Sequence, residues 1–469
     1  MVWVAVDRRL NTPLTKQIFH QLQSKILNGD LKAGQALPST RQLAADLQVS
    51  RNVVLEVYEQ LMAEGYLEAR QGSGTFVAEG ALLKHPLTFE SLPDSIKHTG
   101  TKMTEDIVNF RSGIPALELF PRKHWARLAQ QVLSDTPGRS FGYGSPEGRY
   151  ELRSAIAKYL YRTRGVRCHP DQLVITSGAT QAITLVAKLL VNPGDHIMIE
   201  DPITNDIQTI FTSCGARLIP LPVDHSGIAA DRLVTGAYHG SVYVTPSHQY
   251  PLGSILPIQR RVQLIEYARN TGSYIVEDDY DSEFRYEGPP IHSLQSLDPS
   301  VVIYIGTFSK ILSPALRIGY LILPYPLVER CRMLKWFSDL HTPSLEQLIL
   351  ARFIEEGFLE RHIRQMKKVY KQRRNFLRKV LGQCFGDSVQ VTGDSTGLHL
   401  IAEFTGIRFT NEVLEQMLGA GVSVHGVEMH AIQKGRHENR IILGYGNLEE
   451  QQIEKGISRI KHVLDNIRK

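Results

Sequence analysis

At 469 residues the chain is too long for one compact core, so two or three domains are expected. Its 42% hydrophobic and 22% charged residues are ordinary for a globular protein, its formal net charge is only +5, and no apolar run approaches the roughly 20 residues that cross a bilayer. The four cysteines form no CxxC pair, and charges follow the first residues too soon for a signal peptide. These features argue against a membrane protein and a disulfide framework, and they predict a cytoplasmic protein without a bound metal.

The first 78 residues predict a compact helical domain. Leucine and isoleucine recur at helical spacing from Leu14 to Ile26, and Asn28-Gly29-Asp30 ends that helix. Ser39 is placed to cap a second short helix, and Ser50 is placed to cap a third. The third helix would bury the side chains spaced i, i+3, i+4 and i+7, which are Val54, Val57, Tyr58 and Leu61. Two helices joined by a tight turn, with polar residues opening the second, are typical of a helix-turn-helix that enters the DNA major groove.

Residues 65–77 predict two short strands around a Gly-Ser-Gly turn, which would form the wing of a winged helix. Residues 1–80 hold eight Lys or Arg against eight Asp or Glu, so DNA binding must rest on where single residues point. Phosphate contacts would position the domain, and Arg51 and Asn52 would read bases. The residues expected to face DNA are Ser39, Arg41, Ser50, Arg51, Asn52, Arg70, Ser73 and Gly74.

The helical spacing of the apolar residues alone would also fit a three-helix bundle with no DNA-binding role. The stretch LPSTRQLAADLQVSRNVVLEVYEQLMAEGYLEARQGSGTFV, however, closely resembles the winged helix of the GntR family of bacterial transcription regulators. The resemblance covers roughly residues 12–78 and includes both the helix-turn-helix and the wing. It implies binding to double-stranded operator DNA.

Residues 79–105 show no sustained period and contain two prolines, which predicts a linker. From residue 106 to residue 469, helical segments alternate with β-branched runs, which predicts an α/β domain with a largely parallel sheet. The runs are LVITSG, HIMIED, ARLIPLP, SVYVTP, SYIVEDD, VVIYIGT and YLILP.

The segment TFSKILSPALR places Lys310 between hydroxyl side chains and an arginine. A lysine with a lowered pKa forms Schiff bases with aldehydes, and pyridoxal phosphate needs such a lysine, an acid at its ring nitrogen, hydroxyls and a phosphate cup. Helix N-termini and arginine suit a phosphate, and strand ends of α/β sheets suit ligands. The residues expected to do this are Asp278 for the ring nitrogen, Tyr280 for the phenolic oxygen, and Ala179, Thr180, Thr307, Ser309 and Arg317 for the phosphate.

Each of these features alone is common, since most Ser-Lys dipeptides lie on a surface and glycine turns often precede helices. Their order is more specific: FGYGSPEGRYELRSAIAKYL, TSGATQA, EDDY, the lysine with an arginine seven residues on, and NRIILGYGN resemble, in order, the segments of fold-type I aminotransferases. The resemblance implies a pyridoxal phosphate-dependent transferase fold, with a mostly parallel sheet in a large domain and a smaller α+β domain. It also implies that Lys310 forms the Schiff base, that Tyr143 belongs to the effector site, and that Arg440 grips a carboxylate.

The pattern departs from these aminotransferases in two places. Their Asn-Pro-x-Gly turn, whose asparagine contacts the phenolic oxygen, is here SHQYPLG, so Tyr250 (or Gln249) replaces the asparagine and joins the cofactor site. Thr204 stands where an aromatic ring usually stacks on the cofactor, and we assign it to the effector site. Both changes favour holding the cofactor over rapid turnover.

A GntR-type winged helix, a linker and an aminotransferase-like domain together resemble the MocR/GabR family of regulators over nearly the whole chain. The resemblance implies control of transcription through pyridoxal 5'-phosphate and a head-to-tail homodimer with swapped domains. A small amino compound would displace Lys310 by imine exchange, forming an external aldimine, and so act as the effector. The chain would then sense rather than catalyse.

Two alternatives remain at this level. One is an active aminotransferase with an attached DNA-binding domain. The other is a C-terminal domain that binds no cofactor, against which the full set of site residues argues. Arg440 suggests an effector with a carboxylate or a sulfonate, and the acid Asp206 near Thr204 suggests an additional amine or peptide group.

Overall fold

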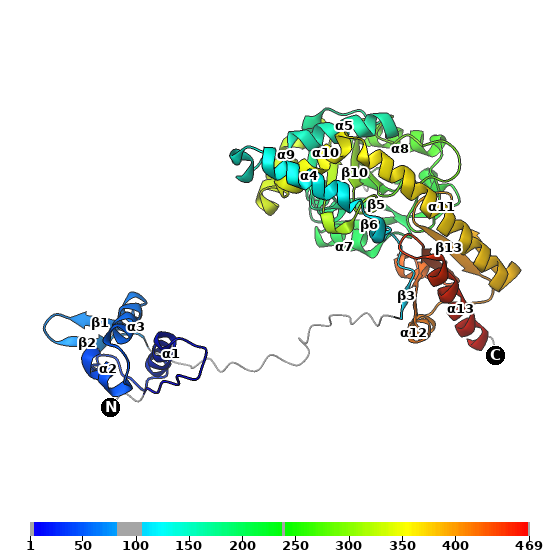
Figure 1. Ribbon diagram of the computed structural model, residues 1–469. Helices are drawn as coiled ribbons and strands as arrows, with labels where there is room; N and C mark the ends of the chain where they lie inside the picture. The colour runs from blue at the N-terminus through cyan, green and yellow to red at the C-terminus, as the bar shows by residue number, and fades with distance from the viewer. Residues whose placement is uncertain (1–3, 82–105, 237–239, 468–469) are drawn as a thin grey trace. The chain divides into compact units, whose positions relative to one another are not determined.

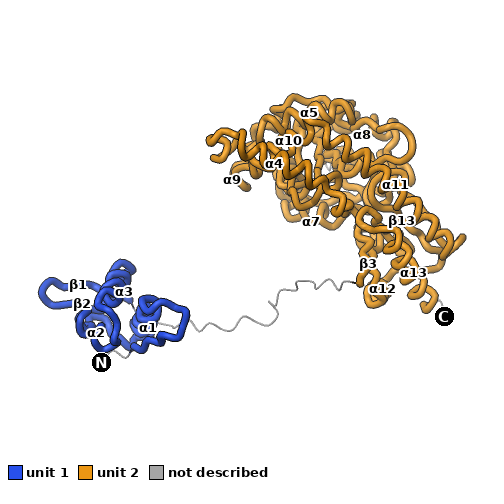
Figure 2. The backbone as a smooth tube through the Cα atoms, in the orientation of Figure 1, with its two compact units in different colours: residues 1–102 blue, residues 103–469 orange. Residues whose placement is uncertain are grey.

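The computed structural model describes residues 4–81, 106–236 and 240–467, and the chain divides into two compact units, residues 1–102 and 103–469 (Figure 2). Most of the predicted linker, residues 79–105, lies outside the described residues, so the boundaries at 78 and 106 stay predictions. None of the helices in the described part of the chain has the length and apolar character needed to span a bilayer.

Unit 1 is a three-helix bundle followed by a two-stranded antiparallel hairpin, as the sequence predicts (Figure 1). Its elements are α1 (Leu14–Leu27), α2 (Thr40–Leu47), α3 (Arg51–Ala63), β1 (Leu67–Arg70) and β2 (Gly74–Val77). The four side chains predicted to be buried on α3 are its buried residues. Together with Ile18, Leu22 and Ile26 of α1 they form one apolar core.

Of the two serine side chains predicted to cap helices, Ser39 does so and Ser50 does not. The Ser39 hydroxyl accepts a hydrogen bond from the Gln42 amide at 3.2 Å and caps α2, as predicted. Ser50 occupies the position before α3, but no amide of α3, all of which is described, donates to its hydroxyl. The cap prediction is therefore wrong for Ser50: its backbone carbonyl accepts from the Val53 amide at 3.1 Å, and its side chain stays exposed.

Unit 2 is built on an eight-stranded sheet of order β4-β11-β10-β9-β8-β5-β6-β7, in which β7 and β11 run antiparallel to their neighbours. All seven predicted β-branched runs form strands of this sheet. The strands are β4 (Leu173–Thr176), β5 (His196–Asp201), β6 (Arg217–Asp224), β7 (Gly227–Ile228), β8 (Ser241–Val244), β9 (Ile275–Asp279), β10 (Val302–Thr307) and β11 (Gly319–Ile322). The mostly parallel α/β sheet is confirmed.

Helices cover both faces of this sheet, because alternate strand residues point to opposite sides. Tyr243 of β8 packs with α6, α7 and α9, whereas its neighbours Val242 and Val244 pack with α8 on the other face, where α4, α5 and α10 also lie. The helices are α4 (Arg122–Asp135), α5 (Tyr150–Arg164), α6 (Ala179–Leu190), α7 (Asn205–Ser213), α8 (Ile258–Thr271), α9 (Tyr325–Asp339) and α10 (Ser344–Glu355).

A smaller α+β region completes unit 2, also as predicted. Its antiparallel sheet has the order β12-β13-β16-β15, and β3 pairs with β14 beside it. The apolar core beneath it centres on Phe110, Tyr370 and Phe404, all fully buried. The elements are β3 (Val108–Asn109), α11 (Phe358–Phe385), β12 (Val389–Thr392), β13 (His399–Phe404), α12 (Asn411–Gly419), β14 (Val422–Ser423), β15 (His425–Gly426), β16 (Arg440–Gly444) and α13 (Glu450–Ile467).

Candidate functional site

The ends of two neighbouring parallel strands, β9 and β10, carry the residues around Lys310. Asp278 lies at the end of β9, Thr307 ends β10, and Lys310 follows three residues later. Burial lowers the pKa of Lys310, and the charges of Asp281 and Asp278 raise it in part. A Cβ atom at Gly113 would lie 2.7 Å from Lys310 Nζ, so a glycine there leaves the amine its space.

Asp278 presents an unsatisfied oxygen. Its Oδ2 accepts a hydrogen bond from the Tyr243 hydroxyl at 2.5 Å, while its buried Oδ1 has no partner among the described residues. Burial raises the pKa of Asp278 to about 6, and the Tyr243 hydrogen bond opposes that rise. An orphaned carboxylate oxygen costs free energy unless a donor meets it. A protonated ring nitrogen would be such a donor, so the residues present fit pyridoxal phosphate at this point.

The predicted phosphate residues are brought together by strand pairing. Thr307 of β10 lies opposite Gly319 of β11, and a Cβ at Gly319 would lie 2.8 Å from the carbonyl carbon of Gly178. Gly178 precedes α6, whose first-turn amides of Ala179 and Thr180 have no partner within the helix. This arrangement would suit an anion at the positive end of α6, and we call it the anion cradle.

Side-chain donors surround the same cradle. Arg317 Nη2 donates to the Ser177 carbonyl at 2.7 Å, and the Thr307 hydroxyl lies 3.1 Å from that of Ser309. Gly178 has φ of 89°, and a Cβ there would lie 2.9 Å from Arg317 Nη2. Both the backbone and the guanidinium therefore require glycine at position 178.

Replacing Gly178 with alanine is expected to weaken phosphate binding about tenfold, since it strains the backbone and displaces Arg317. Titration of pyridoxal phosphate, followed by absorbance, measures the change. Gly194→Ala is the matched control: its φ is 94°, but no atom lies within 4 Å of the added Cβ. It should lower stability without changing cofactor affinity. Equal affinity losses in the two variants would contradict the cradle.

The two predicted tyrosines lie next to one another, with ring centroids 6.2 Å apart. The Tyr280 hydroxyl donates to the His248 carbonyl at 2.9 Å. The Tyr250 hydroxyl lies 3.0 Å from that of Ser112. Gln249 is fully buried and donates to the Pro202 carbonyl at 2.9 Å, so Tyr250 is the better candidate for the residue that replaces the turn asparagine.

The three predicted effector residues, Thr204, Arg440 and Tyr143, each contact other residues of unit 2. The Thr204 hydroxyl caps α7 by accepting from the Asp206 amide at 3.1 Å. Arg440 Nε is already ion-paired with Glu403 Oε2 at 2.9 Å, because β13 and β16 pair these two residues directly. Tyr143 is 84% exposed, and its ring contacts His341.

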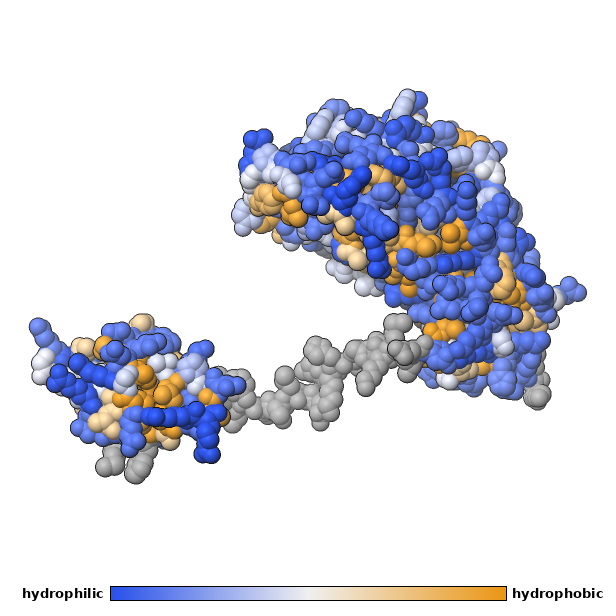
Figure 3. Space-filling model, viewed as in Figure 1, coloured by the Kyte–Doolittle hydropathy of each residue, from blue (hydrophilic) through white to orange (hydrophobic). Residues whose placement is uncertain are grey.

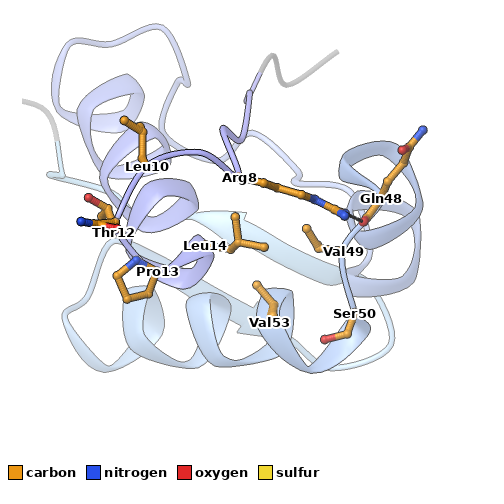
Figure 4. A pocket seen from close by; sticks show the side chains of 10 residues that line it. Arg8, Leu10, Thr12, Pro13, Leu14, Gln48, Val49, Ser50 and Val53 are labelled. Carbon is orange, nitrogen blue, oxygen red and sulfur yellow. Dashed lines mark hydrogen bonds between the residues drawn. The ribbon is translucent and has the colours of Figure 1, made fainter.

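All eight residues predicted to face DNA are exposed on unit 1. The Arg70 guanidinium already forms an ion pair, with its Nη2 2.7 Å from Glu68 Oε1, and it also lies over the ring of Phe76. Arg8, which the sequence reading missed, reaches the turn between α2 and α3, where its Nη2 donates to the Gln48 carbonyl at 2.6 Å (Figure 4). An open cavity of ≈ 600 Å³ lies there, lined in part by Ser50 and Leu14. No helical period marks Arg8, since it precedes α1.

Comparison with known proteins identifies both units. Residues 14–77 match the family described as bacterial regulatory proteins, gntR family, and residues 105–460 match aminotransferase class I and II. The chain is 33% identical to the probable rhizopine catabolism regulatory protein MocR of Rhizobium meliloti, over 98% of this chain and 95% of that protein. The chain belongs to the MocR family of transcriptional regulators. As a MocR family member it is a DNA-binding regulator with an aminotransferase-like domain.

Further relatives match either the whole chain or mainly its aminotransferase-like part. The HTH-type pyridoxine biosynthesis transcriptional regulator PdxR of Corynebacterium glutamicum is 29% identical over 98% of both chains. Aromatic-amino-acid aminotransferase 1 of Thermococcus litoralis is 29% identical over 77% of this chain and 88% of that enzyme. The solved structure of Pyrococcus horikoshii kynurenine aminotransferase superposes with a TM-score of 0.72 at 28% identity, over 78% of this chain and 92% of that one. The transferase fold expected from the sequence is confirmed.

Proposed function

We propose that unit 2 binds pyridoxal 5'-phosphate through Lys310 and senses a small primary amine, and that this binding changes the affinity of unit 1 for operator DNA. One observation carries the proposal. A half-buried lysine with a lowered pKa, a carboxylate oxygen without a partner among the described residues, and an arginine beside the start of α6 lie near the ends of adjacent strands. Each is a group that this cofactor requires.

Lys310, Asp278 and Arg317 would each contact a different part of the bound cofactor. When bound, the cofactor supplies an aldehyde carbon that condenses reversibly with primary amines. Burial keeps more of the Lys310 amine unprotonated and therefore nucleophilic. Asp278 would hold the proton of the ring nitrogen, and Arg317 with the first amides of α6 would neutralise the phosphate.

Sensing is preferred to catalysis for two reasons. Several relatives are named as regulators, and two positions that tune the cofactor in aminotransferases differ here, with Tyr250 in the turn and Thr204 bound as a helix cap. The alternative is an active aminotransferase with an attached DNA-binding domain, and the aminotransferase relatives support it.

Absorbance of the loaded chain with a panel of amino compounds separates the two functions. A regulator should give a lasting spectral change with one class of amine, with no continuing product formation when a 2-oxo acid is added. Sustained turnover over many equivalents of 2-oxo acid would establish the enzyme instead.

The effector should be an amine that also bears an acidic group. Arg440 shares its guanidinium with Glu403, so an effector acid would have to join that ion pair. Asp206 lies at the start of α7, and its charge acts on both Tyr250 and His430. The combination favours compounds with a carboxylate or sulfonate together with a second amine or a peptide group.

An exposed apolar patch on unit 2 supports a homodimer. We define the patch as Phe141, Tyr143, Met333, Trp336, Phe337 and Leu340. Tyr143 contacts His341, which follows directly on Leu340, and hydrophobic residues gather at the α9 end of the unit (Figure 3). Such patches usually mark protein interfaces. A second copy of the chain, arranged head to tail with exchanged domains, is the occupant we propose.

Phe337→Asp tests this interface. Phe337 is 85% exposed, so a charge there costs the free chain little but should raise the dimer dissociation constant at least about 30-fold. Sedimentation equilibrium measures it. Leu418→Asp is the control: Leu418 is an exposed apolar residue on α12, outside the patch, and this variant should leave the dimer intact. An unchanged dimer in Phe337→Asp would exclude the patch as the interface.

A further inference from the structure

A series of polar contacts joins α9 to the residues that precede α6. Lys335 of α9 is fully buried, and its Nζ donates to Asp339 Oδ1 at 2.5 Å. Gln181, in the first turn of α6, donates from its Nε2 to Asp339 Oδ2 at 2.8 Å. Gln181 Oε1 accepts a hydrogen bond from the Ser177 amide at 2.7 Å. The buried lysine is thereby connected, through two side chains, to the backbone of Ser177.

The two partners of Gln181 determine the orientation of its side-chain amide. A backbone amide can only donate and a carboxylate can only accept, so the Gln181 oxygen must face Ser177 and its nitrogen must face Asp339. Lys335 lies one helical turn before Asp339, and their ion pair holds the carboxylate in place. Turning the Gln181 amide over would lose both of its hydrogen bonds.

Ser177 is the residue at which these contacts reach the anion cradle. Its amide is held by Gln181, and its carbonyl accepts from Arg317 Nη2 at 2.7 Å. The next carbonyl, that of Gly178, accepts from the Thr176 hydroxyl at 3.0 Å. The backbone before α6 is therefore fixed by several side chains, and Gln181 is the one that holds the Ser177 amide.

The buried charge at Lys335 is more easily explained by positioning than by stability. Apolar residues of the same size often stabilise a protein as well as a buried ion pair does, because taking charges out of water is costly. An ion pair, however, also fixes the position of a carboxylate that other groups can use. Here the second oxygen of that carboxylate, Asp339 Oδ2, faces Gln181.

We propose that Gln181 and Asp339 are positioning residues that hold the Ser177 backbone, and with it the anion cradle, in the arrangement that binds a phosphate group. Asp339 acts through Gln181, and Lys335 holds Asp339. The inference rests on the proposed function for the identity of the ligand, pyridoxal phosphate. The holding of the Ser177 backbone does not depend on that function.

The test compares two aldehydes on the full chain. Pyridoxal 5'-phosphate and unphosphorylated pyridoxal can both condense with Lys310, but only the first carries a phosphate for the cradle. Absorbance titration gives a dissociation constant for each. Gln181→Met keeps the length of the side chain and removes both hydrogen bonds, so it should weaken binding of pyridoxal phosphate about tenfold and leave that of pyridoxal unchanged.

A second variant tests whether Asp339 acts through Gln181. Asp339→Ala is combined with Lys335→Met, so that no unpaired ammonium stays buried. The Gln181 oxygen remains but is no longer oriented, so binding of pyridoxal phosphate should weaken about threefold. Adding Gln181→Met should give no more than the loss seen with Gln181→Met alone, because residues that act through one another are not additive. Additive losses would overturn the role of Asp339.

Gln452→Met is the matched control. Gln452 Oε1 accepts from the Glu449 amide at 2.9 Å at the start of α13, so the variant removes the same kind of bond outside the cradle. It should change neither constant. Equal losses for the two aldehydes in Gln181→Met would indicate general loosening of the site and would overturn the proposal, as would no loss at all. If one cradle variant fails to fold, the ratio of the two constants in the other decides.

Hydrogen exchange of the cofactor-free chain gives a second readout. Exchange in residues 173–180 should quicken in Gln181→Met, because the Ser177 amide loses its acceptor, and should stay the same in Gln452→Met. If the unaltered chain binds neither aldehyde, the proposed function fails, while exchange still shows whether Gln181 holds Ser177. Unchanged exchange in Gln181→Met would overturn that role.

Discussion

Lys310→Ala is expected to abolish the visible absorbance of the cofactor-loaded chain and to weaken cofactor retention at least about 100-fold, roughly 3 kcal/mol. The physical reason is that the ε-amine is the only covalent anchor the proposal assigns, and Asp278 and Arg317 supply polar contacts alone. Absorbance after dialysis measures the loss. Operator binding should also stop responding to amines.

Two further variants make this result specific. Lys310→Arg retains a cation but forms no Schiff base, so it should behave like the alanine variant. Lys188→Ala removes an exposed lysine of α6 and should change neither absorbance nor retention. Retention of the colour in Lys310→Ala would refute the assignment of the anchor.

Arg51→Ala is expected to weaken operator binding about 10- to 100-fold, roughly 1–3 kcal/mol. Arg51 is the first residue of α3, is exposed and has no ion pair among the described residues, so its side chain is free to meet a base or a phosphate. Fluorescence anisotropy with an operator fragment at fixed salt measures the change, since affinity depends strongly on ionic strength.

Lys25→Ala is the matched control for that measurement. Lys25 carries the same charge but lies eleven residues after Leu14 on α1, about 16 Å along the helix. Leu14 and Ser50 line the same cavity, so the start of α1 lies beside the start of α3 and Lys25 lies well away from it. Similar losses in both variants would mean that general charge, and not α3, drives binding.

The regular elements were predictable because their patterns are local. Alternation of β-branched runs with helices is a property of the chain itself, and all seven runs form strands of the large sheet. The core face of α3 follows from the spacing of four side chains. Ser50 directly precedes α3, as predicted. Whether its hydroxyl turns toward the helix amides depends on the geometry of the turn, which a local sequence pattern does not determine.

The contacts that complete the site were not predictable, because they depend on strand register. Tyr243 reaches Asp278 because β8 and β9 pair with Val244 opposite Glu277. Glu403 meets Arg440 because β13 and β16 pair in one register out of several. The resemblance to known families predicted each functional residue separately. It did not predict which residues of neighbouring strands would contact them.

A buried pair, in which His248 Nδ1 lies 3.0 Å from both carboxylate oxygens of Asp281, was not predictable for the same reason. The two residues lie 33 positions apart and follow two different strands. Each belongs to a segment that the sequence analysis used for another residue, SHQYPLG for Tyr250 and EDDYDSEF for Asp278. Only the parallel pairing of β8 with β9 brings the two side chains together.

The most direct test of the account is one titration with two readouts in the same sample. The loaded chain, with labelled operator DNA, is titrated with an amine that alters its absorbance, and anisotropy is recorded at each addition. If amine binding to unit 2 is coupled to DNA binding by unit 1, operator affinity should change about 5- to 150-fold, the usual range of coupling between two sites, with the same midpoint as the absorbance. An absorbance change that saturates while operator affinity stays constant would contradict it.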